Sequence, residues 1–111
     1  MKKYEIVKKN LEFNDIIKTG RYFKNKYYVI YYKDGIYNFP RFGLAVSTKC
    51  GCAVERNKIK RQLRFILDKY KKLCFKNKNY IIMVRSDINN LSFKEKEQYL
   101  LDVLGKMREK N

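Results

Sequence analysis

The sequence predicts one small domain that contains both helices and strands, spanning residues 1–111. This length fits a single domain, and 45% hydrophobic residues are enough for a small core. Aromatic and β-branched runs, typical of strands, alternate with segments whose apolar residues have helical spacing. Read along the chain, these segments predict a helix, two or three strands, a second helix, a further strand and a last helix.

The first predicted helix spans Leu11–Lys18, and Asn10 is in position to cap its first turn. Phe13, Ile16 and Ile17 fall on one side of this helix, whereas Leu11 does not. A short strand is expected directly after this helix, over Arg21–Phe23.

Two longer strands are predicted next. The run KYYVIYYK (residues 26–33) is apolar or amphipathic on both sides, so we expect this strand inside the sheet. The run FGLAVST (residues 42–48) predicts the following strand. Its alternate residues Gly43, Ala45 and Ser47 are small, which would let another element pack close to the strand.

The second half of the chain alternates again between helix and strand. Gly51 breaks the chain before a long helix, which we expect over about Ala53–Leu73. The run NYIIMVR (Asn79–Arg85) predicts a strand, and SFKE (Ser92–Glu95) predicts a capping box at the start of the last helix. Apolar residues continue this helix at helical spacing: Phe93, Leu100, Val103, Leu104 and Met107.

The long helix has an apolar side and a basic side. At 100° per residue, the apolar side holds Ile59, Leu63, Ile66, Leu67, Tyr70 and Leu73. On the basic side, Arg56, Lys60 and Arg64 form one row, with Asn57 and Arg61 in the adjacent row. Like charges at this spacing weaken an isolated helix, and no Glu stands between them to relieve the repulsion. The pattern favours a phosphate-binding face, because Arg presents a planar two-pronged donor and Lys a point charge. A merely solvated basic face is the alternative.

The overall charge also indicates a polyanionic partner. There are 27 basic and 11 acidic residues, which gives a formal charge of +16. Nucleic acid is the first candidate for the partner, and an anionic membrane surface is the second. Ser47, Thr48 and Lys49 stand just ahead of the long helix, where its positive end favours anions. No apolar run is long enough to span a membrane and no signal peptide is recognisable, so we expect a cytoplasmic location.

The chain offers few side chains for catalysis or metal binding. It contains no His, the commonest general base, and its carboxylates form no D-x-D or E-x-x-H cluster. Cys50, Cys52 and Cys74 are too few for a zinc site without His, so we expect free thiols. The sequence therefore predicts neither a catalytic residue nor a metal ligand.

The stretch AVERNKIKRQLR (residues 53–64) resembles the signature of the bacterial ribonuclease P protein component, R-N-x-x-K-R-x-x-R. The matching residues are Arg56, Asn57, Lys60, Arg61 and Arg64. Three further segments, GLAVSTKCGCAV, KKNLEF and YIIMVR, are similar to the family's strand and turn before this helix, its opening helix and its last strand. The resemblance covers nearly the whole chain.

This resemblance implies a two-layer α+β sandwich with the element order αβββαβα. It also implies a left-handed βαβ crossover through the Arg-rich helix, although most such crossovers are right-handed. It implies that the protein is the small subunit of a ribonucleoprotein, whose catalytic RNA removes the 5′ leader from precursor tRNA. The catalytic Mg²⁺ ions would be held mainly by that RNA, and the protein would be a monomer within the ribonucleoprotein.

The resemblance also implies roles for individual residues. Contacts to the catalytic RNA are implied for Ser47, Lys49, Arg56, Asn57, Lys58, Lys60, Arg61 and Arg64. The single-stranded leader would lie in a cleft between the opening helix and the sheet, at Phe13, Ile17 and Tyr31. Core packing is the alternative role for Phe13 and Tyr31, and Ile17 replaces a residue that is often aromatic. Lys58 replaces the usual second Arg of R-N-R, and Cys52 replaces a common Asn.

Three other functions compete with this one. A general RNA-binding or ribosome-associated module without a role in tRNA maturation would have the same composition. A self-sufficient nuclease is disfavoured by the lack of His. A membrane-surface role is weaker still, because the apolar side of the long helix is needed for the core.

Overall fold

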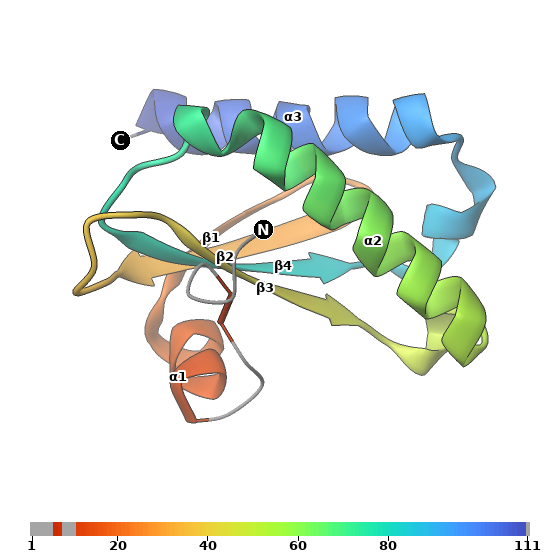
Figure 1. Ribbon diagram of the computed structural model, residues 1–111, viewed down its shortest axis with the longest axis horizontal. Helices are drawn as coiled ribbons and strands as arrows, with labels where there is room; N and C mark the ends of the chain where they lie inside the picture. The colour runs from red at the N-terminus through yellow and green to blue at the C-terminus, as the bar shows by residue number, and fades with distance from the viewer. Residues whose placement is uncertain (1–5, 8–10, 111) are drawn as a thin grey trace.

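The computed structural model, which describes residues 6–7 and 11–110, has a four-stranded sheet with helices on both faces (Figure 1). The predicted α+β class is therefore confirmed. The expected cap Asn10 lies outside the described residues. In chain order the elements are α1 (Leu11–Thr19), β1 (Arg21–Lys24), β2 (Tyr28–Asp34), β3 (Arg41–Val46), α2 (Ala53–Tyr70), β4 (Lys78–Val84) and α3 (Phe93–Lys110).

The strands lie in the order β1-β2-β4-β3. β2 pairs with β1 and β4, both antiparallel, so its predicted position inside the sheet is confirmed. β3 pairs with β4 in parallel, and Gly43 lies opposite Ile81. The chain between these two strands passes through α2, which makes α2 the helix of a βαβ crossover. The left-handed sense of this crossover stays a prediction.

The main core lies between the sheet and the pair α2 and α3, which cover the same face (Figure 1). The strands send every second side chain to this face, as the period of two requires. Tyr28, Ile30 and Tyr32 of β2 are buried there, and so is Tyr80 of β4. The capping box of α3 is confirmed: the Ser92 N–H donates to Glu95 Oε1 at 3.0 Å, and the Glu95 N–H donates to Ser92 Oγ at 3.2 Å.

The opposite face of the sheet is partly covered by α1 (Figure 1). Phe13 and Ile16 pack there against Ile81. A Cβ on Gly43 would lie 2.9 Å from Phe13 Cε2, so the predicted close packing against the small residues of β3 is confirmed at this position. Ser47 lies beyond the end of β3, so its expected place in that strand was wrong. The sheet with α2 and α3 makes the two layers of the sandwich, and α1 adds a small third element.

The predicted end of the long helix at Leu73 was also wrong. α2 ends at Tyr70, and Lys71–Leu73 form a 3₁₀ turn. The turn is closed by the Cys74 N–H, which donates to the Lys71 carbonyl oxygen at 3.0 Å. Tightening of the last turn in this way satisfies carbonyl groups that have no partner at a helix end. Leu73 is therefore rotated out of the apolar stripe, and it is 43% exposed.

Candidate nucleic-acid interface

The orientation of α2 is set by a glycine turn and by a buried stripe. Gly51 has φ 119° and ψ −169°, a conformation that suits glycine, and it redirects the chain between the 3₁₀ turn Thr48–Cys50 and α2. The Cys52 residue at the N-cap makes no side-chain capping bond. Four residues of the predicted apolar side are at most 1% exposed, namely Ile59, Leu63, Ile66 and Leu67. The helix is thus fixed with its remaining sides available to solvent or to a ligand.

The predicted basic rows lie beside this buried stripe. Arg56 and Lys60 are half-buried, whereas Asn57, Arg61 and Arg64 are exposed. Among the residues that the structure describes, no carboxylate forms an ion pair with Arg56, Lys58, Lys60, Arg61 or Arg64. Concentrated positive charge without neutralising acids is the electrostatic signature of a phosphate-binding surface.

Cations elsewhere on the protein behave differently. Lys33 Nζ lies 2.7 Å from Asp15 Oδ2, and Lys78 Nζ lies 2.6 Å from Asp34 Oδ1. The Arg41 guanidinium lies 3.0 Å from Glu12 Oε1. These three acids thus neutralise cations outside α2, so the positive charge of the basic rows stands out from that of the surface around α1, β2 and β4.

Lys58 lies on another side of α2 from the row Arg56, Lys60 and Arg64. It lines a hollow of about 260 Å³ between α2 and the start of α3, together with Lys96. Lys96 is only 6% exposed, and its ammonium donates to Gln62 Oε1 at 2.8 Å. Burial lowers the pKa of Lys96, and the nearby charge of Lys58 lowers it further. Lys58 therefore presents its charge toward α3, away from the row formed by Arg56, Lys60 and Arg64.

Ser47 and Lys49 are exposed beside a second hollow, at the ends of β3 and β4. This hollow has a volume of about 460 Å³, and Lys26 and Arg85 also line it, with Asp87 as the acid. Sequence reasoning did not single out Lys26 or Arg85. Arg85 could have been found from its position, because the carboxyl ends of parallel strands meet at one edge of a sheet.

The predicted leader-binding residues gather where α1 meets the sheet, but they differ in exposure. Phe13 is 3% exposed and belongs to the small core under α1, which favours the packing role. Ile17 and Tyr31 are half-buried at the margin of this core. Tyr22 of β1, which sequence reasoning missed, is 55% exposed, and its ring centroid lies 5.7 Å from that of Tyr31. The open aromatic surface is thus formed by Tyr22 and Tyr31.

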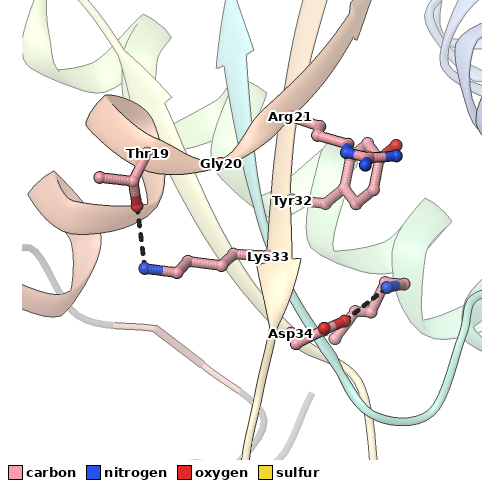
Figure 2. Close-up of a pocket in the computed structure, with 7 residues that line it drawn as sticks. Thr19, Gly20, Arg21, Tyr32, Lys33 and Asp34 are labelled. Atoms are coloured by element: carbon pink, nitrogen blue, oxygen red, sulfur yellow. Dashed lines mark hydrogen bonds and ion pairs between the residues drawn. The ribbon is translucent and has the colours of Figure 1, made fainter.

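A third hollow, of about 320 Å³, lies where the end of α1 meets β1 and β2. Figure 2 shows that Lys33 reaches back to Thr19, to whose Oγ1 it donates at 2.9 Å. The Lys78 ammonium donates to Asp34 Oδ1 at 2.6 Å, and this hydrogen bond lowers the pKa of the Asp34 carboxyl group. Both lysines of this hollow are held by the chain's own groups, so it is a weaker candidate for phosphate than α2.

Metal ligands do not converge in the part of the chain that the structure describes. Within residues 6–7 and 11–110, no three His, Cys, Asp or Glu side chains are grouped so that they could hold a metal ion. In the same residues, no helix is both long enough and apolar enough to cross a membrane.

Comparisons with known proteins agree with this geometry. The family model described as Ribonuclease P matches residues 1–108. The ribonuclease P protein component of Mycoplasma capricolum is 36% identical over 109 residues, which cover 97% of this chain and all of that protein. A Staphylococcus aureus RNase P protein mutant with defective mRNA degradation activity superposes with a TM-score of 0.88, at 31% identity over 96% of this chain and 90% of the other. The RNase P protein from Thermotoga maritima gives a TM-score of 0.79 at 27% identity, over 86% and 91% of the two chains. The chain therefore belongs to the ribonuclease P family, with the bacterial protein components.

Proposed function

We propose that the basic side of α2 binds the ribonuclease P RNA, and that this RNA carries out the hydrolysis. As a ribonuclease P protein component, the chain takes part in tRNA 5′ processing with that RNA and the substrate tRNA. The observation that carries the proposal is the set of cations on α2, Arg56 to Arg64, which have no carboxylate partner among the described residues. Phosphate contacts by such groups release counterions and so give strong binding that depends on salt.

The chemistry that the side chains of this protein offer supports the proposal that the RNA carries out the hydrolysis. The sequence has no His to act as a general base. The described residues provide no set of ligands that fits a catalytic Mg²⁺ ion. The Mg²⁺ ions would therefore be held mainly by the RNA, and the protein would contribute substrate binding and charge neutralisation.

The leader of precursor tRNA would cross the surface between α1 and β1. Tyr31 and Ile17 border this surface, and the exposed ring of Tyr22 beside Tyr31 can stack on a base. Phe13 would support the surface by holding α1 on the sheet. Tyr31→Leu should therefore weaken the binding of precursor tRNA more than that of mature tRNA. Equal losses for both tRNAs would contradict a contact with the leader.

Reconstitution with a bacterial ribonuclease P RNA tests the whole proposal. The protein should stimulate leader cleavage at low Mg²⁺, and its RNA affinity should fall steeply with salt. Arg61→Gln should reduce the slope of log Kd against log salt by about 1, because one phosphate contact is lost. Lys106→Gln is the matched control: this exposed lysine on α3 lies 3.6 Å from Asp102 Oδ2, so its loss should leave the slope unchanged.

Two outcomes of this experiment would contradict the proposal. Absence of stimulation by the unmodified protein would rule out a role in this ribonucleoprotein. Equal affinity for an unrelated structured RNA would favour the general RNA-binding module instead. We further propose that the protein is cytoplasmic. We also propose that it is a monomer within the ribonucleoprotein, because a formal charge of +16 opposes self-association.

A further inference from the structure

Two phenylalanines form an exposed aromatic pair across α2 and α3. Phe65 is 63% exposed in the middle of α2, and Phe93 is 38% exposed at the first position of α3. Their ring centroids lie 6.1 Å apart with an angle of 58° between the planes. Apolar residues of α2 that serve the core are buried, so the exposed ring of Phe65 has no packing role on the sheet side.

Cations surround this pair. Arg61 and Lys69 lie four residues before and after Phe65 and so share its side of the helix. Lys58 lies seven residues before it, also on that side, and lines the hollow between α2 and α3. Lys69 pairs with Glu97 at 3.6 Å, whereas Arg61 and Lys58 pair with no carboxylate among the described residues. The exposed aromatic surface therefore stands within a positively charged region.

Contacts between the helices hold the pair in place. The Lys96 ammonium donates to Gln62 Oε1 at 2.8 Å, about one turn before Phe65 along α2. The Lys69–Glu97 ion pair joins the same helices one turn after it. The capping box fixes the first turn of α3, from which Phe93 projects. A platform that is already ordered loses little conformational entropy when a ligand binds.

We propose that Phe65, backed by Phe93, is a stacking platform for an unpaired nucleobase of the RNA whose phosphates α2 binds. This inference rests on the proposed function, and it adds a base contact to the phosphate contacts. Charge complementarity favours RNA over a second copy of the chain, because two such faces would bring unpaired Arg61 and Lys58 side chains together. A base presents a flat π-face to the ring, while the flanking cations take the adjacent phosphates.

The test measures the affinity for a bacterial ribonuclease P RNA over a series of salt concentrations. Phe65→Leu should weaken binding by about 5- to 150-fold, the range for one base stacked on an aromatic ring. The salt slope should stay unchanged, since no phosphate contact is lost, whereas Arg61→Gln should reduce that slope. Phe65→Tyr should bind as tightly as the unmodified protein, because it keeps an aromatic ring at this position. Ile36→Ala, which removes an apolar side chain that is 92% exposed in the loop after β2, should have no effect.

The outcomes separate this inference from the proposed function. If the unmodified protein binds and stimulates the RNA, and Phe65→Leu binds as tightly, the platform is overturned and the proposed function stands. If the unmodified protein does not bind the RNA, the proposed function fails. The proposed function also fails if the protein binds the RNA but Arg61→Gln leaves the salt slope unchanged. If the unmodified protein is a dimer that Phe65→Leu dissociates while RNA affinity is retained, the pair is a protein interface and the platform is overturned. Circular dichroism of each variant checks that the fold is retained, as expected for exposed positions.

Discussion

The entry into α2 depends on a backbone conformation that only glycine adopts readily. Gly51 has φ 119° and ψ −169°, where a residue with a side chain is strained by about 1–3 kcal/mol. A Cβ at this position would also lie 2.7 Å from Glu55 Oε2, although that side chain can move away. We therefore expect Gly51→Ala to lower the free energy of unfolding by about 1–3 kcal/mol, mainly through the backbone.

The same substitution elsewhere should have the opposite sign. Gly105 lies inside α3, and a Cβ built there meets no heavy atom within 4 Å. Alanine is favoured over glycine in a helix interior by about 0.5–1 kcal/mol, so Gly105→Ala should stabilise the protein. Because both changes add one methyl group, the comparison isolates the backbone conformation of Gly51 from the effect of a larger side chain.

Thermal unfolding followed by circular dichroism measures both effects. For a chain of this length, an unfolding entropy of about 2.1 cal/mol/K per residue gives a shift of roughly 4 °C in Tm per kcal/mol. Gly51→Ala should lower Tm by about 4–13 °C, and Gly105→Ala should raise it by about 2–4 °C. A Gly51→Ala protein that melts at or above the temperature of the unmodified protein would refute the conformation assigned to this turn.

Four further substitutions test the packing, the cap and the charge of the helices. Gly43→Ala should destabilise the protein by about 1–3 kcal/mol in urea denaturation, because the new Cβ would crowd side chains of α1 and β4. Ser92→Ala should cost about 0.5–2 kcal/mol by removing the cap of α3. The hydrogen bond from the Ser92 N–H lowers the pKa of the Glu95 carboxyl group below its ordinary value of 4.5. The stabilisation that the ionised Glu95 contributes is therefore complete above pH 4.5 and is lost as the pH falls through the pKa of Glu95 in the folded protein. Glu95→Gln should flatten that part of the stability–pH curve, and an unchanged curve would argue against the cap. Lys60→Gln removes two like-charge neighbours at four-residue spacing, so it should raise Tm in low salt by about 2–4 °C, an effect that high salt abolishes. Lys106→Gln, which breaks an attractive pair, should not raise it.

Much of the fold could be predicted because its signals are local. The alternation in residues 26–33 places Tyr28 and Ile30 on one face whatever the rest of the chain does, and both are fully buried. The spacing of Ile59 and Leu63 fixes the core side of α2 in the same way. The capping box at Ser92 is a contact between residues three apart, so four letters of sequence are enough to identify it.

Features that depend on distant parts of the chain could not be predicted. The order β1-β2-β4-β3 is decided by which strands pair, and no periodicity reports this. Lys58 belongs to the signature by sequence, yet its proximity to Lys96 is a consequence of how α3 crosses α2. For Phe13 the resemblance implied a leader contact with core packing as the alternative, and only the close approach to Gly43, a residue distant in sequence, shows that the side chain is buried. Tyr22 was missed because the aromatic surface that it forms with Tyr31 arises only when β1 and β2 pair and place the two residues opposite each other.

The anchoring of α2 explains how the helix tolerates its unneutralised charge. Each fully buried leucine or isoleucine, such as Ile59 and Leu63, contributes about 1.5–3 kcal/mol. Each like-charged pair three or four residues apart, such as Lys60 and Arg64, costs only about 0.2–0.5 kcal/mol. Burial therefore outweighs repulsion, and α2 is folded before any RNA arrives. A preformed helix binds RNA without the entropy cost of ordering that a disordered basic segment would incur. The relief of repulsion among the cations when phosphates bind therefore contributes fully to the free energy of binding.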